Sequence, residues 1–203
     1  MRAIATALGA LALAAFLAAA GSAGASDKAA RFDASGKMLF PADYRTWVFL
    51  SSGHGMSYNP AANAAAEAPF DNVFVDPVSY RSFLKTGTWP EGTVLALEVR
   101  AGTSHGSINK SGAYQSGEPL GVEVHTKDTR RFGKADDGWA FFPFEGGKPA
   151  TMIPREAGCC SCHAASTAVD HTFVQFYPTL LPIARAKGTL NPAYLAEEKT
   201  EGH

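Results

Sequence analysis

Five short stretches of the chain are either apolar throughout or alternate between apolar and polar residues, which is the pattern of β-strands. They are residues 47–50, 72–75, 93–100, 121–127 and 138–144. Segments rich in glycine, serine and proline separate them, and no regular strand–helix–strand alternation is evident. We therefore expect an α+β fold, in which one antiparallel sheet of about five strands carries packed helices in a single domain.

The alternation also predicts which faces of these strands are buried. The apolar face of the third stretch consists of Leu95, Leu97 and Val99, and we expect it to point into the core. The polar face of the fourth stretch consists of Glu123, His125 and Lys127. A half-buried strand turns such residues towards water, so this second face is expected to be solvated.

Helices are indicated between and after the strands. Asp76 followed by Pro77 is typical of a helix start, and Gly87 is typical of a helix end. Apolar residues recur at roughly helical spacing over residues 173–183. Pro178 and Pro182 are expected to break or bend that second helix.

The strongest chemical signal is Cys159-Cys160-Ser161-Cys162-His163, which reads C-x-x-C-H, the motif of c-type haem attachment. Cys159 and Cys162 are three residues apart, so in a helical turn both sulfurs lie on one side and can bond one porphyrin. His163 can then present its imidazole to the iron. A redox C-x-x-C, a structural zinc site and a Cys159–Cys162 disulfide are the alternatives.

The N-terminus has the features of a secretory signal peptide. Arg2 precedes an apolar, alanine-rich run, and Ala23-Gly24-Ala25 forms an A-x-A cleavage site. We expect residues 1–25 to be removed near Ala25, leaving a periplasmic domain of residues 26–203 without a membrane segment; a retained anchor is the alternative. The formal net charge of −1 argues against a nucleic-acid partner.

With these residues in place, the chain resembles the cytochrome P-460 family. The matching pieces, in order, are Tyr44-Arg45-x-Trp47-Val48, Val73-Phe74-Val75-Asp76-Pro77-x-Ser79-Tyr80, Thr86-Gly87, Gly92-Thr93-Val94, Glu123, Lys127-Asp128, Arg131-Phe132, Trp139-Ala140-Phe141, Cys159-x-x-Cys162-His163 and Phe173-x-x-Phe176-Tyr177-Pro178-x-Leu180. The resemblance implies an antiparallel sheet with helices, one covalent haem c per chain, a periplasmic location and a homodimer.

The family contains two chemistries, and one residue separates them. Its hydroxylamine-oxidising members carry a lysine bonded to the haem, in a G-T-V-x-x-K-E stretch. Here that position is Leu97, which has no nucleophilic nitrogen. The chain therefore looks closest to the cytochrome c′-beta branch, which implies a five-coordinate haem with an apolar, phenylalanine-capped pocket that binds nitric oxide and carbon monoxide. Phe70 and Phe74 are the candidates for that cap.

Two alternatives remain open at this point. The chain is a hydroxylamine-oxidising oxidoreductase if another lysine, such as Lys85 or Lys110, reaches the porphyrin, or if catalysis needs no cross-link. It is an electron-transfer cytochrome with a periplasmic redox partner if a second residue binds the iron. The candidates for that second ligand are His54, Met56, His105 and His125.

Overall fold

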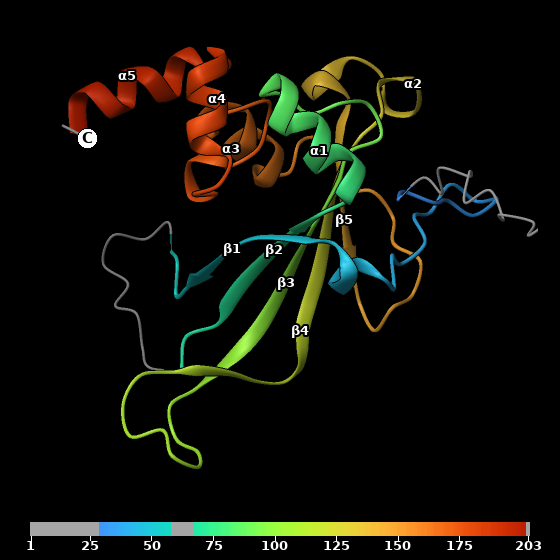
Figure 1. Cartoon of the computed structure of the whole chain (residues 1–203). Coiled ribbons are helices and arrows are strands. Elements are labelled where there is room, and N and C mark those ends of the chain that lie inside the picture. The colour runs from blue at the N-terminus through green and yellow to red at the C-terminus, as the bar shows by residue number, and fades with distance from the viewer. Residues whose placement is uncertain (1–28, 58–66, 202–203) are drawn as a thin grey trace, which may run out of the picture.

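The structure is a computed structural model, and it describes residues 29–57 and 67–201 (Figure 1). Five antiparallel strands form one sheet in chain order: β1 (Val48–His54), β2 (Phe70–Val75), β3 (Val94–Thr103), β4 (Tyr114–Lys127) and β5 (Trp139–Phe144). This confirms the predicted α+β class and the predicted sheet. The predicted signal peptide lies outside the described residues.

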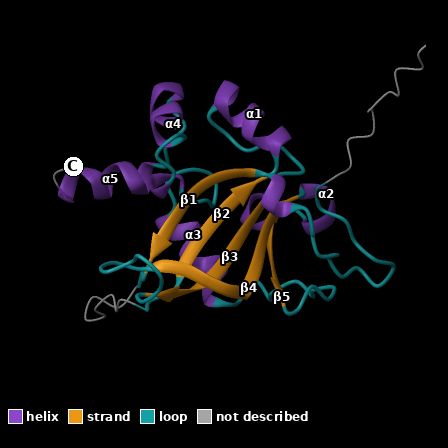
Figure 2. Ribbon diagram, turned by 60° about the horizontal axis from the view of Figure 1, so that its bottom comes forward, coloured by secondary structure: helices purple, strands orange, loops and turns teal. Residues whose placement is uncertain are grey.

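Helices gather around one end of the sheet, and β2, β3 and β4 extend past them (Figures 1 and 2). They are α1 (Pro77–Thr86), α2 (Thr129–Phe132), α3 (Gly158–Ser166), α4 (Leu181–Lys187) and α5 (Pro192–Glu201), with 3₁₀ turns at Tyr44–Thr46, Ala135–Gly138 and Val174–Phe176. Within the described ranges, no helix has the length and apolar character needed to cross a membrane.

The predicted ends of α1 are confirmed. The Asp76 carboxylate accepts hydrogen bonds from the backbone N–H groups of Val78 and Ser79, at 3.1 and 2.9 Å, as an N-cap should. Its second oxygen accepts from the Val94 N–H at 3.0 Å, so the same side chain ties the helix to β3. Gly87 ends the helix with φ of 75°, a left-handed conformation that favours glycine.

One pair of strands is longer than the sequence-based expectation. The pairing of β3 with β4 continues through Thr103 and Tyr114, inside a segment expected to be a loop, because backbone pairing needs no apolar pattern there. A register shift at Arg100 accompanies this extension. The break expected within residues 173–183 is confirmed, because a 3₁₀ turn precedes Pro178 and α4 follows it.

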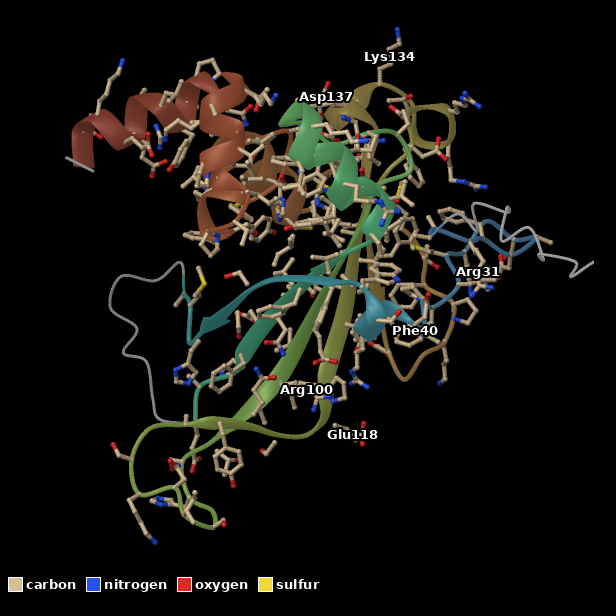
Figure 3. All side chains as sticks on the ribbon, in the orientation of Figure 1. Arg31, Phe40, Arg100, Glu118, Lys134 and Asp137 are labelled. Atoms are coloured by element: carbon tan, nitrogen blue, oxygen red, sulfur yellow. The ribbon has the colours of Figure 1, made fainter. Side chains whose placement is uncertain are left out.

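Both faces of the sheet are covered, which overturns the expectation of one buried face. The site face carries Leu95, His125 and Phe141, which are register partners across β3, β4 and β5. The opposite face, on which the N-terminal segment packs, is called the arm face. It carries the alternate residues of each strand, including Val94 and Ala96, which are fully buried. The N-terminal segment packs there through residues such as Met38, Phe40 and Tyr44, and Phe40 is labelled in Figure 3.

The predicted solvated face of β4 is also wrong in part. Glu123 is exposed, but His125 is buried at 8 % exposure and Lys127 is mostly covered. The strand β4 alternates as predicted, but His125 and Lys127 are covered by residues of the helices and loops, such as His163 and Asp170. A single strand cannot show what will be packed against each of its faces.

Candidate haem site

Helix α3 carries the C-x-x-C-H motif. Cys159 and Cys162 are partly exposed, Cys160 is buried, and none of the three forms a disulfide bond. The Cys160 Sγ lies 3.9 Å from the Pro154 carbonyl oxygen, and burial raises the pKa of this thiol. Cys160 is thus a packed side chain, while Cys159 and Cys162 remain partly accessible, as bonding to a porphyrin requires.

His163 is held in one orientation. Its Nδ1 donates a hydrogen bond to the backbone carbonyl oxygen of His171 at 2.8 Å. The rings of Phe141 and Phe173 meet the imidazole edge-on, with centroids 4.7 and 4.4 Å away. Burial lowers the pKa of His163, although the bond to His171 opposes that shift. The ring therefore favours its neutral form with Nε2 as acceptor, the form that binds a metal.

His125 belongs to the same site. The sequence predicted it only as a possible second iron ligand, on a strand face expected to be solvated. Its ring stacks on Phe141 with centroids 3.9 Å apart and meets His163 edge-on at 5.0 Å. This direct ring contact leaves no room for a porphyrin between the two histidines, so His125 is not placed as the opposite axial ligand. Burial lowers the pKa of His125 well below its ordinary value.

One polar atom beside His163 is unsatisfied. Among the described residues, His125 Nε2 is buried without a hydrogen-bond partner. Buried polar groups are almost always paired, so an orphan at this position indicates that a further group completes the site. The residues present fit a haem: two thiols for its vinyl groups, an oriented imidazole for its iron, and aromatic walls.

Leu97 lies on the site face, as the strand alternation predicts. Its register partners are Val73 on β2 and Glu123 on β4, and Val99 lies two residues further along the same face. Leu97 is partly buried. Asp71, the partner of Val99, also lies there, and burial raises the pKa of its carboxyl. The site face thus offers apolar side chains with carboxylates at its margins.

The structure does not bring Phe70 or Phe74 together with Leu97 and His163. Phe74 pairs with Ala96 and Phe70 pairs with Arg100, which places both on the arm face. There Phe74 meets Tyr44 edge-on at 5.7 Å, and Phe70 stacks on His54 at 4.3 Å. This corrects the expectation of a phenylalanine cap, because residues of even and odd number on β2 point to opposite faces.

The other candidate ligands and nucleophiles are also placed. His54 lies on the arm face, and His105, Lys85 and Lys110 are exposed outside the site. Met56 is different. Its Sδ lies against Gly53, in the space that a side chain at this position would fill. Gly53 is the register partner of Asp71, so the thioether lies over the margin of the site face.

Comparison with known proteins agrees with this geometry. No curated protein matches the chain. The family described as Cytochrome P460 matches residues 41–174, a span that includes β1 to β5, Leu97, His125 and the complete C-x-x-C-H motif. The chain therefore belongs to the cytochrome P460 family and is a haem-binding cytochrome.

Proposed function

We propose that this protein is a monohaem c-type cytochrome that binds small uncharged gases, nitric oxide and carbon monoxide, at a five-coordinate iron. Cys159 and Cys162 hold the haem through thioether bonds, and His163 is its only protein ligand. The observation that carries the proposal is Leu97. By resemblance to the family it takes the position of the cross-linking lysine, and it lies on the same sheet face as His125 and Phe141, which contact His163.

The side chains of the chain have distinct tasks in this proposal. The His171 carbonyl and the rings of Phe141 and Phe173 orient His163. The haem supplies the iron at which the gas binds. Leu97 and Val73 present only C–H groups to that side, so a bound dioxygen would gain no hydrogen bond from them. The Glu123 carboxylate, next to Leu97, disfavours anionic ligands by charge repulsion.

Two measurements on the purified protein test the proposal against the enzymatic alternative. Intact mass spectrometry should give the chain from Ser26 plus one covalently bound haem. Incubation with hydroxylamine and an electron acceptor should give no turnover, because Leu97 cannot form the cross-link. Sustained hydroxylamine oxidation would contradict the gas-binding role, and a mass without haem would contradict covalent attachment.

Met56 favours a second candidate, an electron-transfer cytochrome with methionine as sixth ligand. Its thioether lies over the margin of the site face, and methionine is a known axial ligand of cytochrome haem. Met56→Ala separates the two. Under the gas-binding proposal the variant keeps the wild-type ferrous spectrum. A change from a low-spin to a high-spin spectrum would favour the electron-transfer role.

Export and assembly are part of the proposal. The A-x-A site at Ala25 supports a periplasmic location, and the family resemblance supports a homodimer. Light scattering coupled to size-exclusion chromatography should give twice the mass of one haem-loaded chain. A monomer mass at micromolar concentration would refute the assembly.

A further inference from the structure

The carbonyl group that orients His163 belongs to a strained turn. Residues 169–172 form this turn, and Val169 and Thr172 pair across it. Asp170 and His171 have φ angles of 47° and 59°, in the left-handed region. Two consecutive non-glycine residues in that region are costly, and they persist only where the surroundings hold them. The His171 carbonyl therefore stays in position because something else fixes the turn.

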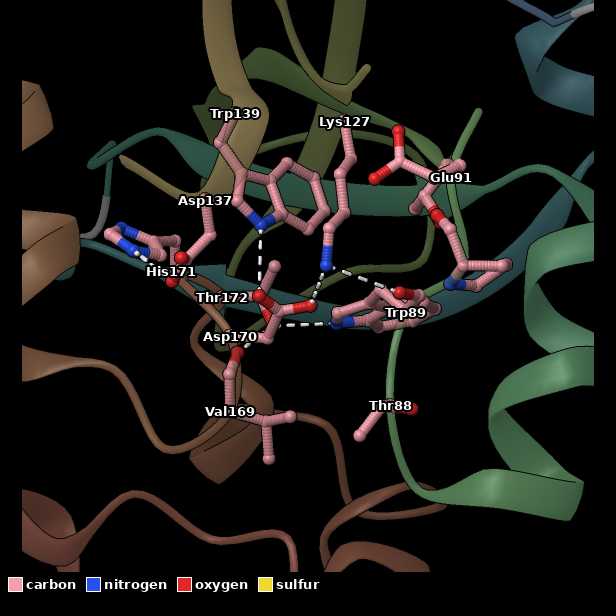
Figure 4. A network of polar contacts seen from close by, with 12 residues as sticks. Thr88, Trp89, Glu91, Lys127, Asp137, Trp139, Val169, Asp170, His171 and Thr172 are labelled. Atoms are coloured by element: carbon pink, nitrogen blue, oxygen red, sulfur yellow. Dashed lines mark hydrogen bonds and ion pairs between the residues drawn. The ribbon is translucent and has the colours of Figure 1, made fainter. Parts of the chain in front are cut away.

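The sheet supplies that restraint through the Asp170 carboxylate (Figure 4). One carboxylate oxygen pairs with Lys127 Nζ of β4 at 2.6 Å. The other accepts a hydrogen bond from Trp139 Nε1 of β5 at 3.2 Å. The side chains of Lys127 and Asp170 are only 15 % and 16 % exposed, so water competes weakly for this pair. Both oxygens of the turn's carboxylate are thus bound to neighbouring strands.

A second attachment holds the far end of the turn. The Thr172 hydroxyl accepts a hydrogen bond from Trp89 Nε1 at 2.7 Å and donates to the Val169 carbonyl at 2.6 Å. Lys127 Nζ also lies 3.3 Å from the Trp89 carbonyl oxygen. The Lys127 ammonium group therefore contacts both Asp170 and Trp89, the residue that holds Thr172. Its removal should loosen the turn more than the loss of an isolated surface ion pair would.

We propose that the Lys127–Asp170 pair is a positioning device for the proximal histidine. By fixing the turn, it fixes the hydrogen bond from His163 Nδ1 to the His171 carbonyl. Such a bond orients a ligating imidazole and raises its basicity. A more basic imidazole binds iron more strongly and stabilises the ferric state, which lowers the midpoint potential. The inference rests on the proposed ligation of iron by His163.

The variants Lys127→Met and Asp170→Asn test the pair in the haem-loaded protein. Asn keeps the shape of Asp and tolerates the left-handed conformation. Lys127→Arg is the conservative rescue. Arg185→Met is the matched control, since it removes the ion pair of 2.5 Å between Arg185 and Glu198, which joins α4 to α5 outside the turn. The readouts are the iron–histidine stretching frequency of the ferrous protein and the midpoint potential.

The two variants distinguish positioning from simple charge effects. Simple electrostatics predicts opposite changes: loss of the Lys127 cation lowers the potential and loss of the Asp170 anion raises it. Positioning predicts that the midpoint potential changes in the same direction in both variants, because each variant weakens the hydrogen bond from His163 Nδ1 to the His171 carbonyl. We expect both variants to raise the potential, up to a tenfold shift in the ferrous-to-ferric ratio, which is about 59 mV for one electron.

The stretching frequency should fall in both variants and stay at the wild-type value in Lys127→Arg and Arg185→Met. An unmoved frequency together with potential changes of opposite sign would overturn the positioning role. If Lys127→Met fails to incorporate haem, Asp170→Asn and Lys127→Arg still give the comparison. Absence of the iron–histidine band from the ferrous wild-type protein would instead refute the proposed five-coordinate ligation by His163.

Discussion

Replacement of Glu98 by glutamine should destabilise the protein at neutral pH. Glu98 follows Leu97 on β3 but points to the arm face, where it is 3 % exposed. Its carboxylate binds Arg45 at 2.7 Å and Arg100 at 2.6 Å, and it accepts a hydrogen bond from the Tyr44 hydroxyl. It therefore fastens the N-terminal segment to the strand that presents Leu97.

The magnitude follows from the pKa of Glu98. Burial alone would raise this pKa, but hydrogen bonds from Arg100, Tyr44 and Arg45 outweigh burial and lower it from 4.5 to about 2. Each unit corresponds to about 1.4 kcal/mol, so the ionised carboxylate contributes on the order of 3 kcal/mol to folding at pH 7. The loss of one partner from a buried ion pair has a cost of similar size.

The sign of the pH dependence is fixed by the direction of the shift. A carboxyl whose pKa is lower in the folded state stabilises above its unfolded pKa, and this contribution is lost as pH falls from about 4.5 towards 2. The stability difference between wild type and Glu98→Gln should therefore narrow by about 2 kcal/mol between pH 7 and pH 3.

Urea titrations at pH 7 and pH 3, monitored by near-ultraviolet circular dichroism, measure this difference in the free energy of unfolding. Glu145→Gln is the matched control, because Glu145 is an exposed carboxylate on the loop after β5. It should change the free energy of unfolding by less than about 0.5 kcal/mol. A loss below about 1 kcal/mol for Glu98→Gln at pH 7, or an equal loss at pH 7 and pH 3, would refute the reasoning.

Three further predictions concern the haem and the fold. Leu97→Lys restores an amine on the site face, so treatment with peroxide should displace the Soret band to longer wavelength; an unchanged spectrum would mean that residue 97 does not face the macrocycle. His163→Ala removes the proposed iron ligand, so the wild-type ferrous spectrum should be lost, and its retention would contradict the ligation. Asp76→Ala removes the cap of α1 and the bond to Val94, so thermal unfolding should show a loss of about 1–2 kcal/mol; a loss near zero would show that water replaces the cap.

Much of the fold could be predicted because its signals are local. The sheet class followed from short alternating stretches separated by turns, and α1 followed from Asp76, Pro77 and Gly87. The placement of Leu97 on the site face also followed from strand alternation alone. These features depend on residues that are close together in the sequence, so one sequence is sufficient to show them.

The rest depends on contacts between distant segments. His125 looked solvated because a single strand does not reveal that Phe141 and His163 will cover it. Phe74 was a candidate for the cap because it is aromatic and closely follows the long loop that ends at Phe70, but its register with Ala96 turns it to the arm face. The turn that carries Asp170 and His171 had no sequence signal, since neither residue is a glycine.

The absorption spectrum of the purified ferrous protein, recorded before and after addition of carbon monoxide, tests the central claim most directly. The account predicts a five-coordinate, high-spin spectrum that shifts on binding of the gas. A low-spin spectrum that does not respond to carbon monoxide would contradict it, because a second protein ligand would then occupy the iron. A Soret band strongly displaced to the red before any addition would also contradict it, because it would show a cross-link despite Leu97.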